Sequence, residues 1–222
     1  MSAAEPRPVR AVWTDFGGVL TPSGDESTRA FCAHVQVAPE MLRKAVMKVT
    51  ARYGTEDAME PLDTPLVTEK EWAAQVERVL AEDFGVTADL RDFGAVWFAD
   101  RPVVQEWLDW LRRLKAHGLF VGMLSNMPPG WDPYWRRMVP PEGLFEQVVV
   151  SHRAGARKPM RRIFEIAAEA AGATPGECLL VDDMPVNCEG AVAAGWRAVR
   201  FTDPAQAIAE VAALLDLDPL GV

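Results

Sequence analysis

Five short apolar runs, separated mostly by helical patterns, constrain the fold of this chain more than any other feature of its sequence. Runs of this length, without polar alternation, are typical of parallel strands that are buried on both faces. Strands that alternate with helices favour an α/β fold, here a doubly wound, Rossmann-like parallel sheet. The runs are Val9–Trp13, Leu119–Leu124, Val148–Val150, Cys178–Val181 and Ala198–Phe201.

Two of the helical patterns are well delimited. The segment Pro102–His117 has apolar residues three or four positions apart, opens with a proline in its first turn and is followed by a glycine. The segment Met160–Ala171 repeats this design. Both helices are expected to pack on the sheet, so Trp107 and Trp110 are predicted to be core residues rather than site residues.

The stretch from about Gly24 to Asp100 breaks the alternation, because it holds helical patterns and no convincing buried strand. Thr68 to Glu71 form a capping-box sequence ahead of an amphipathic pattern, and Pro39 begins another candidate helix. We therefore predict a core domain of residues 1–21 and 102–222 and an inserted helical cap domain of residues 22–101. A block inserted directly after the first strand would cover the carboxyl edge of the sheet, where open α/β sheets bind ligands.

The charge balance limits the partners. With 32 acidic and 23 basic residues, the chain has a formal charge of −9, which repels a nucleic-acid backbone. No apolar run approaches the roughly 20 residues that span a bilayer, and the N-terminal MSAAEPRPVR resembles no secretory signal. We expect a cytoplasmic protein that binds neither nucleic acid nor membranes, with Cys178 as a reduced core thiol. An anionic substrate would then need a metal ion or a positioned lysine to compensate its charge.

Polar residues follow the ends of the first two main strands. A carboxylate at Asp15, followed by Gly17 and Gly18, which let a ligand approach the backbone, suits a nucleophile. Ser125 and Asn126 can donate hydrogen bonds to phosphoryl oxygens. Each group also has a simpler interpretation, an aspartate in a tight turn and a Ser-Asn pair that begins a turn.

Two further groups lie later in the chain. Lys158 precedes a proline near a helix start and can offset charge on a transferring group, although a single lysine is usually solvated. Asp182 and Asp183 directly follow an apolar strand, and Asn187 lies shortly after them. Adjacent carboxylates repel each other unless a cation or a lysine stabilises them, and Mg²⁺ prefers such oxygens. The alternative is that the two acids cap a helix.

The order Asp-turn, Ser-Asn, Lys-Pro, Asp-Asp resembles the four-motif signature of the haloacid dehalogenase (HAD) superfamily, from Asp15 to Asn187. The helical insert is similar to the type 1 cap of that superfamily. Asp-Phe-Gly-Gly-Val-Leu and Asp-Asp-Met-Pro-Val-Asn are most similar to one branch. This branch includes sugar-phosphate phosphatases and the phosphatase domain of soluble epoxide hydrolase.

The resemblance implies a role for each matching residue. Asp15 would be the nucleophile that becomes an aspartyl-phosphate, and Lys158 would bridge it to the phosphate. The phosphoryl group of a small phosphorylated metabolite would lie against Ser125, Asn126 and Gly18. The Mg²⁺ cofactor would be held by Asp15, Asp183 and the carbonyl of Gly17, with Asp182 in support and a metal-bound water on Asn187.

One position departs from the signature. Phosphatases of this superfamily usually carry a second Asp two positions after the nucleophile, where this chain has Gly17. That Asp protonates the leaving alcohol and activates the hydrolytic water, and general acid–base catalysis is worth about 10²–10⁴-fold. Some sugar-phosphate phosphatases of the branch also resemble Asp-x-Gly here. Asp25, Glu26 and His152 are the candidate replacements, each with a structural or solvated alternative.

Three functions follow. The first is slow, Mg²⁺-dependent hydrolysis of a small phosphomonoester through an aspartyl-phosphate. The second is hydrolytic dehalogenation of a 2-haloacid, which also dispenses with the second Asp but leaves Asp182 and Asp183 unpaired because dehalogenases need no metal. The third is a catalytically weak binding or regulatory module, favoured by Gly17 and opposed by the retention of Lys158. The sequence indicates neither the substrate nor the oligomeric state, although Trp72, Trp97, Trp131 and Trp135 are candidates for lining the site.

Overall fold

The five strands form one parallel sheet in the order β3-β2-β1-β4-β5, in a computed structural model that describes residues 8–218. Each predicted apolar run forms a strand with ends shifted by one or two residues, and the predicted α/β fold is confirmed. The outermost residues of the predicted core domain, 1–7 and 219–222, and most of the MSAAEPRPVR segment lie outside the described residues. The strands are β1 Ala11–Thr14, β2 Phe120–Ser125, β3 Gln147–Val150, β4 Cys178–Asp182 and β5 Arg197–Arg200.

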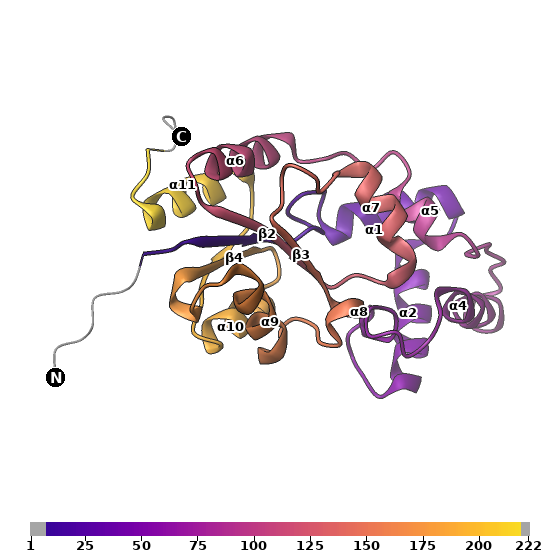
Figure 1. The fold of residues 1–222 in the computed structure, drawn as a ribbon. Coiled ribbons are helices and arrows are strands. Elements are labelled where there is room, and N and C mark those ends of the chain that lie inside the picture. Colours follow the sequence, from indigo (N-terminus) through magenta and orange to yellow (C-terminus); the bar gives the residue numbers. More distant parts are fainter. Residues whose placement is uncertain (1–7, 219–222) are drawn as a thin grey trace.

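Helices cover both faces of the sheet (Figure 1). Successive side chains of a strand point to opposite faces. On β1, Val12 therefore joins the core under α6 Gln105–Ala116 and α11 Pro204–Leu215. Trp13 joins the core under α9 Arg161–Ala171 and α10 Pro185–Ala193.

Helix α6 begins three residues later than its sequence pattern predicts. The backbone N–H of Val104 donates to the carbonyl of Leu20 at 2.9 Å, so the chain just before the helix runs beside the segment that leaves β1. Trp107 and Trp110 are fully buried, as predicted for core residues. The proline at 102 therefore stands before the helix and not inside its first turn.

A helical block lies between β1 and β2 in the chain and at one end of the sheet in space (Figure 1). The Thr68 side chain accepts from the N–H of Glu71 at 3.2 Å and closes the predicted capping box. The division into a core and a cap at residues 22 and 101 stays a prediction. The block comprises α1 Gly24–Val35, α2 Pro39–Thr50, the 3₁₀ turn η1 Ala51–Tyr53, α3 Glu60–Asp63, α4 Glu69–Phe84 and α5 Phe93–Phe98.

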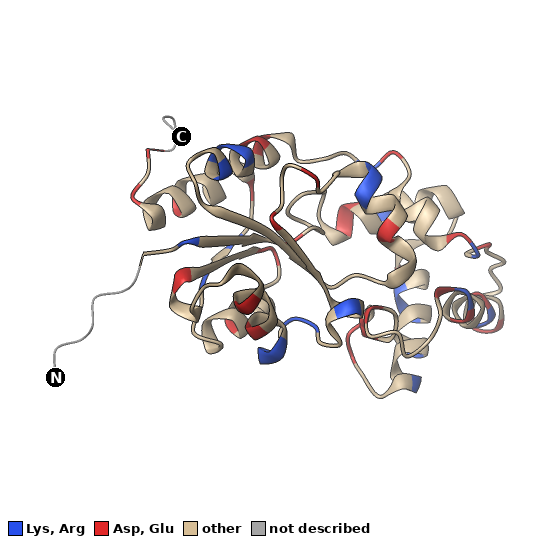
Figure 2. Cartoon of the chain, viewed as in Figure 1, with Lys and Arg blue, Asp and Glu red and all other residues tan. Residues whose placement is uncertain are grey.

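Short elements complete the chain: η2 Pro129–Trp131, α7 Asp132–Met138, α8 Ser151–Ala154 and η3 Pro175–Glu177. Both signs of charge alternate along surface helices such as α4 (Figure 2). Within residues 8–218, no helix is long and apolar enough to cross a membrane. Cys178 is fully buried and unpaired.

Candidate active site

Three carboxylates meet at the carboxyl edge of the sheet. Asp15 directly follows β1, and Asp182 and Asp183 end and follow β4, which pairs with β1 in parallel. Each carboxylate offers an oxygen within 4.8 Å of the oxygens of the other two. Asp182 is fully buried, Asp15 is buried and Asp183 is half-buried. Negative charges this close are unfavourable unless a cation lies among them.

Lys158 supplies part of that positive charge. Its Nζ lies 2.9 Å from Asp15 Oδ1 and 2.5 Å from Asp182 Oδ2. Burial opposes the charged form of the amine, but the charges of Asp15 and Asp182 outweigh it and raise the pKa of Lys158. The side chain is 1% exposed, so this is a buried, paired cation and not a solvated surface lysine.

Asn126 holds the backbone of Lys158. Its Oδ1 accepts from the Lys158 N–H at 2.8 Å, and its Nδ2 donates to the Lys158 carbonyl at 2.9 Å. The side chain therefore orients the lysine, a role that the sequence did not indicate. Its predicted contact with a phosphoryl group stays a prediction. Ser125 ends β2 beside the nucleophile candidate, and its hydroxyl lowers the pKa of the Asp15 carboxyl.

Asp182 is satisfied by donors from three sides. Its Oδ1 accepts from the backbone N–H of Met184 at 2.9 Å and from Nδ2 of Asn187 at 3.0 Å, while Oδ2 faces Lys158. Asn187 thus binds Asp182 in this structure, and its predicted hold on a metal-bound water stays a prediction. Asp15 and Asp183 are the better placed of the three carboxylates for direct contact with a cation.

The ionisation of the cluster reflects an excess of negative charge. Burial raises the pKa of Asp183 to about 7, and the neighbouring Asp15 and Asp182 add to that effect. Burial likewise raises the pKa of Asp15, assisted by Asp182 and opposed by Lys158. A divalent cation bound among the carboxylates would lower the pKa of both Asp183 and Asp15. Carboxylate oxygens are the donors that Mg²⁺ prefers, so the residues present fit that ion.

The two glycines after the nucleophile candidate differ in what surrounds them. Gly18 has a φ of +77°, and a Cβ placed on it would lie 2.1 Å from Oδ2 of Asp183. Only glycine allows this close approach. A Cβ on Gly17 would meet no atom within 4 Å, so the missing aspartate leaves free space.

The candidate replacements for that aspartate have other roles. Glu26 closes the capping box of α1 with Ser23, whose hydrogen bonds lower the pKa of the glutamate. Asp25 is exposed in the same helical turn. His152 has Nδ1 2.7 Å from the carbonyl oxygen of Met127. Among the described residues, the carboxylate cluster comprises Asp15, Asp182 and Asp183 alone.

The candidate aromatic residues lie in the core or beside a cavity that no residue of the carboxylate cluster lines. Trp72 is 1% exposed and packs edge-on against Phe93, so the expectation that it lines a pocket is wrong. Trp97 lines a cavity of about 350 Å³. Trp135 packs against Phe16, the neighbour of Asp15, at a ring-centroid distance of 6.2 Å.

Trp131 is buried and instead joins the core to the helical block. Its Nε1 donates to Oε2 of Glu69 in α4 at 2.6 Å. Its ring stacks on those of Phe93 and Trp97, both of which belong to α5.

Arg101 is a site candidate that sequence reasoning missed, because a lone arginine ahead of a helix belongs to no motif. Its guanidinium lies over the rings of Trp97 and Phe98, at 5.3 and 5.8 Å from their centroids. Nη2 donates to the carbonyl of Pro22 at 3.2 Å, whereas Nε is buried without a hydrogen-bond partner. Burial lowers the pKa of Arg101 to about 10, and the negative charge of Asp15 opposes that shift.

A second missed feature supports the backbone of Asp15. The indole Nε1 of Trp107 donates to Oγ1 of Thr14 at 3.1 Å, and that hydroxyl donates to the carbonyl of Asp15 at 2.9 Å. Periodicity alone indicated only that Trp107 is buried. The tryptophan therefore connects α6 to the nucleophile candidate as well as filling the core.

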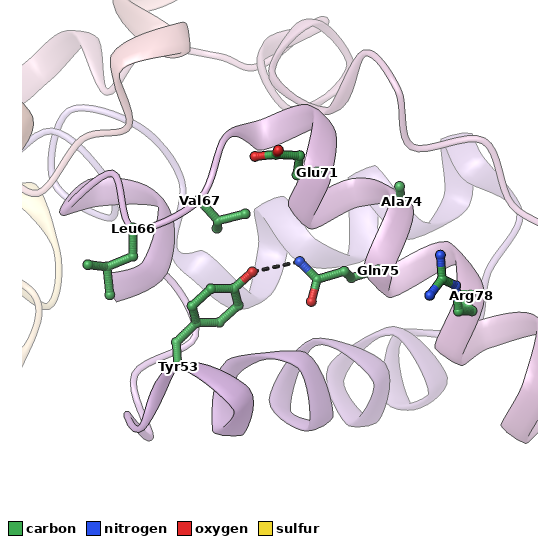
Figure 3. A pocket seen from close by; sticks show the side chains of 7 residues that line it. All are labelled: Tyr53, Leu66, Val67, Glu71, Ala74, Gln75 and Arg78. Atoms are coloured by element: carbon green, nitrogen blue, oxygen red, sulfur yellow. Dashed lines mark hydrogen bonds between the residues drawn. The ribbon is translucent and has the colours of Figure 1, made fainter.

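A larger hollow lies away from the carboxylates. It encloses about 510 Å³ between η1 and α4 and is lined by seven residues that include Tyr53, Leu66 and Arg78 (Figure 3). Nε2 of Gln75 donates to the hydroxyl of Tyr53 at 2.6 Å across it. No residue of the carboxylate cluster lines this hollow, so it belongs to the helical block and not to the candidate active site.

Comparisons with known proteins agree on one family. Residues 9–195 match the family model described as haloacid dehalogenase-like hydrolase. A phosphoserine phosphatase from Thermus thermophilus is 31% identical over 208 residues, which cover 86% of this chain and 80% of the relative.

Two solved structures with low identity share the fold. A HAD-family enzyme from Bacteroides thetaiotaomicron, in complex with magnesium and inorganic phosphate, is 21% identical with a TM-score of 0.61, over 86% of this chain and 93% of that one. The L-2-haloacid dehalogenase from Xanthobacter autotrophicus, with chloropropionic acid covalently bound, is 18% identical with a TM-score of 0.63, over 96% of this chain and 85% of that one.

Proposed function

Because the chain belongs to the haloacid dehalogenase-like hydrolases, we propose that it is a Mg²⁺-dependent phosphatase that hydrolyses a small phosphomonoester through an aspartyl-phosphate on Asp15. One observation carries the proposal. Asp15, Asp182 and Asp183 converge within 4.8 Å, and the lysine that contacts two of them leaves two negative charges uncompensated when all are ionised. A bound dication balances those charges.

The chain's own residues account for the first step. A carboxylate oxygen of Asp15 attacks phosphorus, and the bond from phosphorus to the alcohol oxygen breaks as the new bond forms. Lys158, which contacts Asp15, and the Ser125 hydroxyl stabilise charge on the phosphoryl oxygens. Mg²⁺, held by Asp15 and Asp183, would supply further charge stabilisation. With glycine at position 17, the departing alkoxide takes its proton from water.

The second step regenerates the carboxylate. Water attacks phosphorus and loses a proton to solvent, the acyl phosphate bond breaks, and the Asp15 carboxylate leaves as phosphate is released. A general base accelerates such an attack by about 10²–10⁴-fold. Glycine at position 17 cannot act as one, and we infer that this step limits turnover.

Dehalogenation is the second candidate, and Gly17 is the observation that favours it. The same Asp15 carboxylate would attack carbon and displace halide. The opposing observation is Asp183, which approaches Gly18 so closely that a Cβ there would overlap it. A metal-free haloacid site would place that carboxylate beside an anionic substrate with no cation to balance it.

The experiment compares three substrates with one purified protein. An aryl phosphate and phosphoserine, the latter suggested by the name of the Thermus relative, are assayed for phosphate release with Mg²⁺ and with EDTA. L-2-chloropropionate is assayed for chloride. We expect Mg²⁺-dependent phosphate release. Halide release that persists in EDTA would favour the dehalogenase over the proposed phosphatase. Inactivity on all three substrates would favour a binding or regulatory module.

A further inference from the structure

Arg157, the residue before Lys158, is buried against the helical block. Its Nε and Nη2 donate to the two oxygens of Asp63 at 2.9 and 3.1 Å, a bidentate pair. The Asp63 side chain is 0% exposed and that of Arg157 is 7% exposed. A buried ion pair tolerates little displacement, because moving one partner leaves the other charge without compensation.

Two more carboxylates face the same guanidinium. Nη2 also donates to Oδ2 of Asp57 at 2.8 Å, and Nη1 lies 3.6 Å from Oε2 of Glu60. Asp57 is 48% exposed and contributes less, since solvent screens it. The segment 57–63 thus converges on one arginine of the core, next to the lysine that contacts Asp15.

A second connection closes the arrangement into a ring. The hydroxyl of Ser151 donates to the backbone carbonyl of Asp63 at 2.9 Å and accepts from the N–H of Met127 at 3.0 Å. Met127 follows Asn126, whose side chain bonds to both the N–H and the carbonyl of Lys158. The backbone of Lys158 is therefore held from one side by Asn126 and through Arg157 from the other.

We propose that Arg157 is a positioning residue for the reaction at Asp15, and that it acts by anchoring the backbone of Lys158 to Asp63 of the helical block. The inference rests on the proposed phosphatase function. A lysine side chain is a flexible stem of four carbons, so the position of its Nζ depends on where its backbone is fixed. Misplacement of a catalytic group by about 1 Å can cost about 10²-fold in rate. The site is then complete only when segment 57–63 is docked on the core.

The test uses steady-state kinetics on an aryl phosphate with saturating Mg²⁺. Arg157→Gln and Asp63→Asn are each expected to lower kcat by about 10- to 100-fold, the usual cost of losing a supporting partner, with a much smaller change in KM. Arg157→Lys keeps the charge without the bidentate contact and should fall between the wild type and Arg157→Gln. The Arg157→Gln/Asp63→Asn double variant should lose little more than either single variant, because the two residues act through one contact.

The matched control is Leu80→Ala. Leu80 is fully buried in α4, so this variant destabilises the helical block without touching the ring. It is expected to lower Tm while leaving kcat within about twofold, as for a substitution that affects stability alone. If Leu80→Ala and Asp63→Asn lower Tm to the same extent, an equal loss of kcat in both variants would overturn the proposal. Full activity of Arg157→Gln would also overturn it.

Amide hydrogen exchange separates failure of this inference from failure of the proposed function. Asp63→Asn is expected to increase exchange at residues 126–127 and 156–158 together, whether or not the protein hydrolyses a phosphomonoester. Unchanged exchange in those segments would overturn the anchoring role. An inactive wild type whose exchange responds as expected would refute the phosphatase alone.

Discussion

Each ionisable residue of the carboxylate cluster has a different set of partners, and those partners separate the roles. Asp182 accepts from Lys158, Met184 and Asn187 and serves to orient the lysine. Asp15 contacts Lys158 and Ser125 and has a neighbouring glycine in place of a carboxylate. Single substitutions at this scale therefore test attack, proton transfer and cation binding one at a time.

Asp15→Asn is expected to abolish phosphate release, because an amide is not a nucleophile towards phosphorus at neutral pH. The substitution preserves shape, so Tm should remain close to that of the wild type. Phosphate release and thermal unfolding are measured on the same preparation. Near-wild-type turnover by the folded variant would contradict the assignment of the nucleophile.

Gly17 predicts a kinetic signature. With a good leaving group, attack by Asp15 needs no protonation, whereas hydrolysis of the phosphoenzyme lacks a general base. A burst of released alcohol followed by slow turnover is expected, with a labile phosphate on Asp15 detected by intact-mass spectrometry. Gly17→Asp should speed the slow phase by about 10²-fold, since no atom obstructs the new Cβ.

Gly17→Asn is the matched control for that experiment. It fills the same space without transferring a proton and should leave the slow phase unchanged. Fast turnover of a poor-leaving-group substrate by the wild type, without burst or phosphoenzyme, would show that another residue transfers the protons.

Gly18→Ala is expected to weaken Mg²⁺ binding by about tenfold or more, because the new methyl group displaces the Asp183 carboxylate that it would overlap. Gly17→Ala is the control and should bind Mg²⁺ as the wild type does. Isothermal titration calorimetry measures both. Asp183→Ala should lose affinity at least as strongly, and unchanged affinity in that variant would mean that the cation lies elsewhere.

At the scale of elements, a few buried polar contacts join the helical block to the sheet. Glu69 of α4 accepts from Trp131, and Asp63 of α3 pairs with Arg157. Buried contacts of this kind hold only when both partners are in place. The ion pair among them should give stability a measurable pH dependence.

Burial raises the pKa of Asp63 to about 6, although Arg157 opposes the shift and Asp57 and Glu60 add to it. A carboxyl whose folded pKa lies above its unfolded value binds its proton more tightly when folded. Its contribution to stability is therefore full below about pH 4 and is lost as pH rises through about 6. Urea unfolding from pH 4 to 7 should show that loss in the wild type, up to about 3 kcal/mol, and a flatter profile in Asp63→Asn. Parallel profiles of unfolding free energy against pH in the wild type and in Asp63→Asn would contradict this prediction.

For the whole molecule, the sequence predicted the sheet, the helical insert and the residues at the carboxyl edge, because those follow from local patterns. A short apolar run between helical patterns favours a buried strand, and parallel strands bring their ends to one edge. The ion pair between Arg157 and Asp63 joins residues 94 positions apart, so no local sequence pattern predicts it. The same holds for the hydrogen bonds between Asn126 and Lys158. Such contacts form only when segments far apart in the chain pack together. The burial of Trp72 has the same origin.

The place of β1 in the sheet has a consequence for how the molecule is made. It is the first of the five strands to be synthesised and the central strand of the sheet, and Ala11 pairs with Phe120 on one side and with Cys178 on the other. Long-range parallel pairing folds slowly, so we expect Trp13 to lack most of its core during synthesis until α9, β4 and α10 emerge. A chain stopped before β4 should therefore aggregate in pelleting assays while the full chain stays in the supernatant. The strand that leads to Asp15 is translated before the other four but completes its pairing only with β4, so we expect the nascent chain to bind chaperones during its elongation.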